Sequence, residues 1–153
     1  MALFLSVFCR SAGVLTRAEL AEFCDDGWYE DEDLTFDPPA GDEALAAVDW
    51  SRLDIIVPGQ PRPISVTRDV GDAVTPYVTE AIDEIADAAP AAIVEHLRAT
   101  AQILAFEVAP DRLGDNEWEL LDSLEAWIAQ RFDGIVVTDD GIYDKDLTVL
   151  IAR

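Results

Sequence analysis

The chain has 153 residues, half of them apolar, which is enough for one domain with a well-packed core. Its 32 acidic residues, against ten Lys and Arg, give a formal net charge of -22. Because Lys and Arg are needed to neutralise phosphates, this composition argues against direct binding of nucleic acid or of an anionic membrane, and it favours a basic protein as partner.

An apolar stretch over residues 2–9 predicts a buried first strand. The stretch is too short to span a bilayer and lacks the basic region and cleavage site of a signal peptide, so we expect a cytoplasmic protein. Cys9 and Cys24 are too few and too far apart to form a disulfide framework. We expect two reduced, packed thiols, with a single bridge between them as the open alternative.

A helix is predicted after this strand, because Thr16 and Glu19 are spaced as a capping box and Leu15 and Leu20 as a hydrophobic staple. Gly27 suits the C-terminal end of that helix. Acidic residues begin in its last turn, where the helix dipole is already negative. Since that placement costs stability, we interpret it as serving something other than folding.

Residues 25–33, here called the acidic run, contain six carboxylates and no basic residue. Crowded carboxylates repel one another, and a Trp–Tyr pair among them is typical of an interface anchor. Residues 25–54 hold 11 acids and one base, whereas the other 123 residues hold 21 acids and nine bases. We therefore predict a site for a basic protein partner, formed by Asp25, Asp26, Trp28, Tyr29, Glu30, Asp31, Glu32 and Asp33.

Residues 29–49 are predicted to form an irregular acidic loop, broken by Pro38, Pro39 and Gly41, with a short strand near residues 34–36. Two apolar segments follow, at residues 53–57 and 64–68, and a Pro-Gly turn separates them. This arrangement predicts a hairpin.

A helix over about residues 72–88 has a two-sided pattern, with apolar residues on one side and carboxylates on the other. This segment contains no Lys or Arg, and like charges at helical spacing destabilise a helix. We call the four carboxylates on its polar side the acidic stripe and predict a secondary part of the partner site there: Glu80, Asp83, Glu84 and Asp87. Pro90 then breaks or restarts the helix, which continues to about Thr100.

The last third of the chain predicts a strand at residues 103–108 and a helix capped by Asp115 or Asn116. A strand beginning near Gly134, a turn at residues 139–141 and a closing strand at residues 147–151 follow. The order β-α-β-β-α-α-β-α-β-β indicates a single α+β domain over residues 1–153, with about four helices packed on a mixed or antiparallel sheet.

Few residues suggest catalysis. His96 is the single histidine, which excludes a metal site with several His, and we expect it to be structural. The aspartates over residues 139–146 lack the spacing of a calcium-binding EF-hand loop. Motifs for phosphate loops, serine nucleophiles and zinc sites are missing, so we expect a non-enzymatic protein without cofactor or metal. An enzyme would need a pocket that gathers His96, a Cys or a pair of carboxylates.

A Leu-rich helix that leads into Phe132-Asp133-Gly134-Ile135-Val136 and then into Gly141-Ile142-Tyr143-Asp144 resembles the C-terminal end of several small bacterial α+β proteins. Some of these are immunity proteins of polymorphic or contact-dependent toxin systems. The resemblance covers about a fifth of the chain, from Trp118 to Leu150, and identifies no binding residue. It implies an immunity protein that neutralises a toxin.

Two hypotheses of different kinds follow. The first is a non-enzymatic binding protein whose acidic surface docks on and occludes a basic partner, such as a cationic toxin. The alternative is an acidic housekeeping domain whose charge is an adaptation to its solvent or proteome, as the 20 Asp, nine Arg and single Lys would also allow. The alternative predicts low stability in dilute buffer and strong stabilisation by molar salt.

Overall fold

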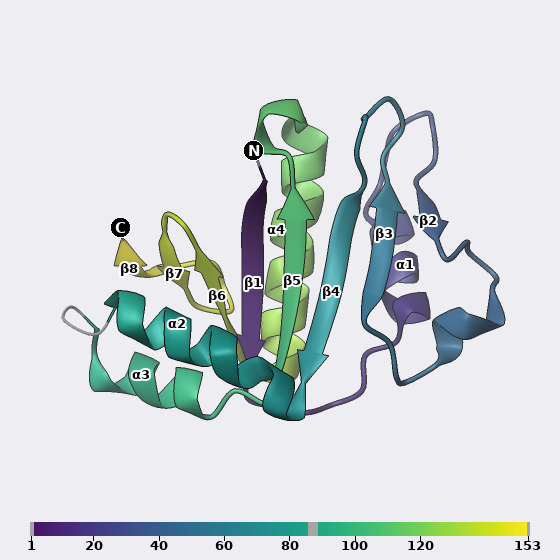
Figure 1. Cartoon of the computed structure of the whole chain (residues 1–153). Coiled ribbons are helices and arrows are strands. Elements are labelled where there is room, and N and C mark those ends of the chain that lie inside the picture. The colour runs from purple at the N-terminus through teal and green to yellow at the C-terminus, as the bar shows by residue number, and fades with distance from the viewer. Residues whose placement is uncertain (1, 86–88, 153) are drawn as a thin grey trace.

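A computed structural model of the chain describes residues 2–85 and 89–152. Eight strands in the described residues form one antiparallel sheet, in the order β2-β3-β4-β5-β1-β6-β7-β8, with four α-helices packed on it (Figure 1). This architecture confirms the predicted α+β class and the predicted order of the elements. The strands are β1 (Leu3–Cys9), β2 (Thr35–Asp37), β3 (Arg52–Ile56), β4 (Ile64–Val70), β5 (Gln102–Val108), β6 (Gly134–Thr138), β7 (Gly141–Tyr143) and β8 (Val149–Ala152). The α-helices are α1 (Arg17–Asp26), α2 (Thr75–Ile85), α3 (Ala91–Arg98) and α4 (Asp115–Phe132), and the short 3-10 turns are η1 (Glu43–Ala46), η2 (Gly71–Val74) and η3 (Pro110–Arg112).

The first strand lies at the centre of the sheet, between β5 and β6, as its continuous apolar sequence predicts. Successive side chains of a strand point to opposite faces, and both faces are covered by helices here. Val7 therefore packs into the core under α1 and α4, whereas Phe8 packs into a second core under α2 and α3.

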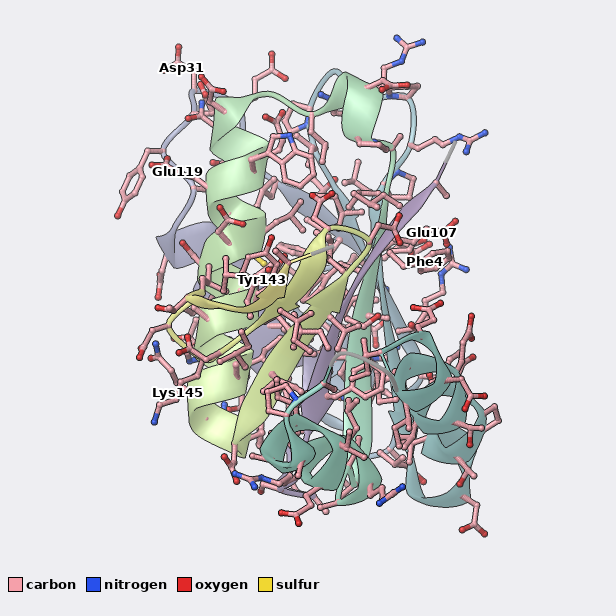
Figure 2. The ribbon with its side chains drawn as sticks, turned by 90° about the vertical axis from the view of Figure 1, so that its left-hand side faces the viewer. Phe4, Asp31, Glu107, Glu119, Tyr143 and Lys145 are labelled. Carbon is pink, nitrogen blue, oxygen red and sulfur yellow. The ribbon has the colours of Figure 1, made fainter. Side chains whose placement is uncertain are left out.

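The helices α2 and α3 cover only one end of their face of the sheet (Figure 1). Phe4, near the start of β1, is 55% exposed on that face, and Glu107 of β5 pairs with it across the ladder and is also exposed. Figure 2 shows both side chains on the side of the sheet opposite to α4.

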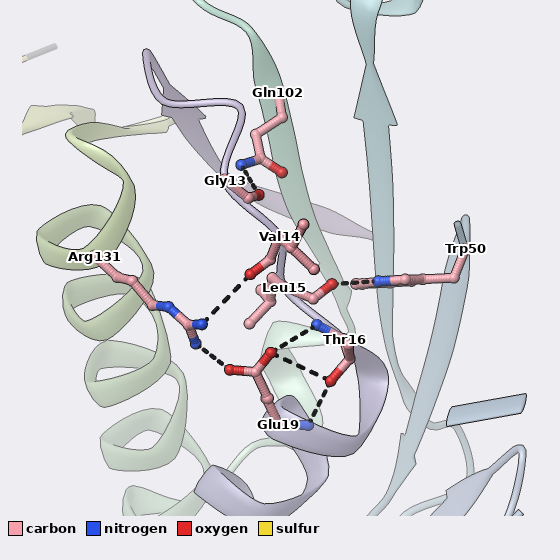
Figure 3. Close-up of polar contacts among 8 residues, drawn as sticks. All are labelled: Gly13, Val14, Leu15, Thr16, Glu19, Trp50, Gln102 and Arg131. Carbon is pink, nitrogen blue, oxygen red and sulfur yellow. Dashed lines mark hydrogen bonds and ion pairs between the residues drawn. The ribbon is translucent and has the colours of Figure 1, made fainter. Parts of the chain in front are cut away.

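Residues 11–15 connect β1 to α1 and are held by side chains from distant segments (Figure 3). The Nε2 of Gln102 donates to the carbonyl oxygens of Ser11 and Gly13, at 2.8 and 2.9 Å. The Nε1 of Trp50 donates to the carbonyl oxygen of Leu15 at 2.6 Å. Buried backbone carbonyls are satisfied in this way, and the connection is fixed against the sheet.

The start of α1 is fixed by the predicted capping box (Figure 3). The backbone N–H of Glu19 donates to the Thr16 hydroxyl, and the Glu19 carboxylate accepts from the Thr16 N–H, both at 3.2 Å. The same carboxylate forms an ion pair with Arg131 of α4. Because α1 is tied to α4 here, the point at which the acidic run leaves α1 is fixed as well.

The predicted acidic loop over residues 29–49 is more regular than the sequence indicated. The strand expected near residues 34–36 is β2, which pairs with β3 through Phe36 and Ile55. Within the predicted loop, η1 buries Leu45 in the main core. Single apolar residues at 34, 36 and 45 are therefore sufficient to anchor a segment that is otherwise polar.

The predicted cap of α4, Asp115 or Asn116, is one or two residues too late. The helix begins at Asp115, and the N-cap is Gly114, whose N–H donates to the Glu117 carboxylate at 3.1 Å. Asp115 lies within the first turn instead, where its negative charge complements the helix dipole.

Candidate functional site

The acidic run continues from the last turn of α1 into a tight loop held by Trp28. Its indole ring is half-buried against the main core, and its Nε1 donates to the Glu32 carbonyl oxygen at 3.0 Å. Tyr29, in contrast, is 91% exposed. The two rings were predicted together as anchors for a partner, but the structure gives them different tasks. Trp28 holds the loop in shape, and Tyr29 stands free in solvent.

All six carboxylates of the acidic run are exposed. The pKa of Asp25 is raised, first by partial loss of solvation and then by the neighbouring charges of Asp33 and Asp26. Within residues 2–85 and 89–152, the ion pairs join Arg10 to Asp133, Arg52 to Asp54 and Arg131 to Glu19, and none includes a carboxylate of the run. The predicted crowding of negative charge is therefore present, and no ion pair among the described residues neutralises it.

A groove of about 410 Å³ opens beside the acidic run. Its walls come from three segments that are distant in the sequence: the run, the β3–β4 turn and the first turn of α4. Figure 2 shows Asp31 beside the N-terminal end of α4. The lining residues are Trp28, Glu30, Asp31, Glu32, Pro58, Gly59 and Glu117.

Carboxylates around an indole ring are suited to a Lys or Arg side chain, because the ring accepts a cation over its face and the carboxylates supply charge-assisted hydrogen bonds. Sequence reasoning did not find Glu117, which has a second task. One of its oxygens caps Gly114, and the other accepts from Gln60 at 3.4 Å. Glu117 therefore lines the groove with both carboxylate oxygens already hydrogen-bonded. The exposed acids that line the groove are Glu30, Asp31 and Glu32.

The acidic stripe lies elsewhere. Glu80, Asp83 and Glu84 are exposed on α2, and Asp87 lies outside the described residues. Glu80 and Glu84 border a different groove of about 450 Å³, between α2 and the uncovered part of the sheet. Because α2 and the acidic run lie over opposite faces of the sheet, the structure does not join the stripe and the run into one surface (Figure 1).

His96 and the two cysteines are enclosed by the fold. His96 is 7% exposed, with its Nε2 2.9 Å from the Phe8 carbonyl oxygen, and burial lowers its pKa. Cys9 and Cys24 are free and buried, and burial raises the pKa of each thiol to about 12. The two thiols are free and packed, as the sequence predicted, and the imidazole is enclosed.

Sequence reasoning missed Glu125, the most perturbed carboxyl in the described chain. It is 4% exposed, its Oε1 has no hydrogen-bond partner, and burial together with the charge of Asp122 raises its pKa to about 8. A signal was present in the sequence. Position 125 lies beside Leu124 and four residues after Leu121, inside the apolar stripe of α4.

Within the described residues, no three His, Cys, Asp or Glu side chains gather closely enough to hold a metal ion. The helices described are each too short or too polar to cross a membrane.

Comparison of the chain with protein-family models, curated proteins and solved structures found no match. Its function must therefore be argued from its own geometry.

Proposed function

We propose that this protein is a non-enzymatic binding protein whose acidic run docks on a basic protein and occludes the basic surface. The observation that carries the proposal is the exposed and unneutralised charge of the run, gathered around a groove with Tyr29 beside it. A protein that needed these acids only for solvation would be more stable with them apart.

The proposed mechanism has an approach step and a docking step. The net charge of -22 attracts a cationic partner from a distance and speeds association, by an amount that salt reduces. On contact, Lys or Arg side chains enter the groove between Glu30, Asp31 and Glu32, and the exposed ring of Tyr29 loses water against the partner. Relief of the repulsion that raises the pKa of Asp25 adds to the binding free energy.

The most concrete form of this proposal is an immunity protein that acts in the cytoplasm on a cationic toxin. The resemblance of residues 118–150 to toxin immunity proteins supports this form. A toxin that binds nucleic acid through Lys and Arg would be blocked directly, because the acids of the run would occupy the side chains that contact phosphates.

The test is a charge reversal with a matched control. The cluster variant carries Asp31→Lys, Glu32→Lys and Asp33→Lys. The control carries Asp72→Lys, Glu95→Lys and Asp146→Lys, three exposed acids that lie apart from one another on η2, α3 and the β7–β8 connection. Both variants change the formal net charge by the same amount, so they differ only in whether the reversed charges are clustered at the groove.

Proteins retained at low salt from a lysate of the source cells by the wild type are compared with those retained by the two variants. The expected partner is a basic protein that the control retains and the cluster variant loses, with affinity for the cluster variant reduced by about tenfold or more. Its association rate with the wild type should fall steeply as salt is added. If the purified partner bound the cluster variant with unchanged affinity and unchanged salt dependence, the acidic run would not be the docking site.

A further inference from the structure

A second pocket, of about 290 Å³, lies on the other flank of α4 and is here called the Glu125 pocket. Its floor is apolar, from Leu3 and Leu5 of β1 and from Leu147. Trp118, Asp122 and Glu125 form the helix side, spaced so that they share one face of α4. The β6–β7 hairpin closes the pocket with residues 138–140 and with Tyr143, which Figure 2 shows over the middle of α4.

Glu125 is the unexplained residue of this pocket. A carboxyl that is 4% exposed, with an oxygen that no group among the described residues satisfies, lowers stability. An apolar side chain at the same position would continue the stripe of Leu121, Leu124 and Ile128 without that cost. Fold stability therefore does not account for the carboxyl, and a ligand that completes its hydrogen bonds would.

The surroundings of Glu125 select the charge of that ligand. Asp122, Asp139 and Asp140 line the same pocket, and no basic residue does. An anion would be repelled, and a neutral ligand would gain hydrogen bonds at most, without charge attraction. A cation would gain from all of them, and also from the aromatic rings of Trp118 and Tyr143, which are half-buried in the wall.

The same surroundings favour an organic cation over a metal ion. Within the described residues no three carboxylates gather closely enough to coordinate a metal, whereas aromatic and Leu side chains supply contact area for the carbon atoms of an organic ligand. A volume of about 290 Å³ is at the lower limit of small-molecule sites, so the pocket suits the end of one side chain or a small amine.

We propose that the Glu125 pocket binds one organic cation, an alkylammonium or guanidinium group, with Glu125 as its buried counter-ion and Trp118 and Tyr143 as its aromatic walls. The cation is either a free amine or a Lys or Arg side chain presented by another protein. The site is separate from the acidic run, and its chemistry holds whether or not the run binds a partner.

Binding of the cation is coupled to a proton. With a pKa of about 8, Glu125 is mostly protonated at neutral pH when the pocket holds no ligand, and a cation favours its ionised form. The titratable groups that face it are Asp122 from α4, Asp139 and Asp140 from the hairpin turn and Tyr143 from β7, while β1 contributes only Leu3 and Leu5. Since an alkylammonium stays charged in this range, affinity should be about tenfold weaker at pH 7 than at pH 9.

The test is an NMR titration of the whole chain with butylammonium chloride, followed through the indole N–H of Trp118. We expect saturable shifts at concentrations on the order of 1–10 mM, the range for a ligand with few non-hydrogen atoms. Sodium chloride at equal ionic strength and 1-butanol, which has the same length without the charge, should leave that signal in place. Equal shifts with either control, or no shift at pH 9, would overturn the proposal.

Two variants of α4 separate the pocket from general charge effects. Glu125→Gln keeps the shape of the side chain and removes the charge, and it should weaken binding at pH 9 by about tenfold or more and remove its pH dependence. Glu119→Gln, at an exposed position of the same helix, should bind like the wild type. Unchanged binding by Glu125→Gln would contradict the assignment, and the pH dependence of the wild type tests it even if that variant folded poorly.

A third ligand distinguishes the two sources of the cation. Lysine blocked at both ends as amides carries the same ammonium group on a peptide backbone. If it binds as tightly as butylammonium, the pocket accepts a protein side chain; if only butylammonium binds, the pocket serves a free amine. The Asp31/Glu32/Asp33 reversal variant should bind butylammonium like the wild type, so a failure of the docking proposal and a failure of this one give different results.

Discussion

At the scale of single residues, Asp25 and Glu125 both have a raised pKa, but they differ in how far solvent reaches them. Asp25 is exposed, and partial loss of solvation and then the charges of Asp33 and Asp26 raise its pKa, so salt or a cationic partner can relieve the repulsive part of the shift. Glu125 is enclosed, and burial is the larger cause of its raised pKa. Solvent screens Glu125 much less than Asp25, so its protonation is coupled more strongly to folding.

Glu125→Gln should make fold stability less dependent on pH. Between the ordinary pKa of 4.5 and the folded-state pKa of about 8, the folded protein holds a proton that the unfolded chain has released. Below the lower value Glu125 is protonated in both states and ionisation costs the folded protein nothing. As pH rises from the lower value towards the upper one, the folded protein loses stability. Removing this linkage should stabilise the protein above pH 8 by on the order of 4 kcal/mol, relative to the wild type at the same pH.

Urea unfolding between pH 5 and pH 9 measures this difference. Glu119→Gln removes a carboxyl from an exposed position of the same helix and is the matched control. The free energy of unfolding of this control should change with pH as steeply as that of the wild type. If the free energy of unfolding of Glu125→Gln depended on pH as steeply as that of the wild type, water would reach the Glu125 carboxyl in the folded protein.

At the scale of elements, the C-terminal hairpin depends on one glycine. Gly141 begins β7 with a φ of 155°, and a Cβ at this position would lie 2.1 Å from the carbonyl oxygen of Ile151 in β8. No side chain fits between two paired strands at that distance. The acidic turn before Gly141 also forms the mouth of the Glu125 pocket, so the pairing of β7 and β8 supports that site.

Gly141→Ala should destabilise the protein by about 2 kcal/mol or more, because the clash forces β7 and β8 apart. Gly59→Ala is the matched control, since Gly59 has a φ of 80° in the β3–β4 turn with no atom near its missing Cβ. It carries backbone strain without a clash and should cost only about 1–2 kcal/mol. Urea unfolding of both variants measures the difference, and equal losses would show that β8 is not held against Gly141.

At the scale of the whole molecule, the net charge of -22 makes stability depend on salt. If the repulsion is concentrated in the acidic run, screening should raise Tm between about 0.01 M and about 0.3 M NaCl and have little effect beyond that. The Asp31/Glu32/Asp33 reversal should remove more of this gain than the scattered reversal of Asp72, Glu95 and Asp146. An acidic domain adapted to a saline solvent would instead continue to gain stability in molar salt.

Thermal unfolding by circular dichroism across this range of salt distinguishes the two hypotheses. The docking proposal requires that the cluster and scattered variants differ. Equal salt dependence in both variants, with a steady gain up to molar salt, would favour charge as a general adaptation.

Much of the fold was predictable because local patterns and tertiary packing agree. The capping box of Thr16 and Glu19, the hairpin of β3 and β4, and the apolar face of α2 follow from spacings within a few residues. The cap of α4 was predicted one or two residues too late, because Asp115 and Asn116 are better caps by residue type than Gly114. The reach of the Glu117 side chain decided the position.

The candidate sites were less predictable, because each depends on distances between segments. The sequence by itself determined that negative charge is concentrated in residues 25–33, since charge depends on composition alone. Only the tertiary structure decided that Trp28 is used to hold the loop while Tyr29 remains exposed, and that the acidic stripe of α2 lies over the opposite face of the sheet. Only the structure encloses Glu125 between α4, β1 and the β6–β7 hairpin. A carboxyl's charge is a property of its residue, but its solvation and its neighbours are properties of the fold.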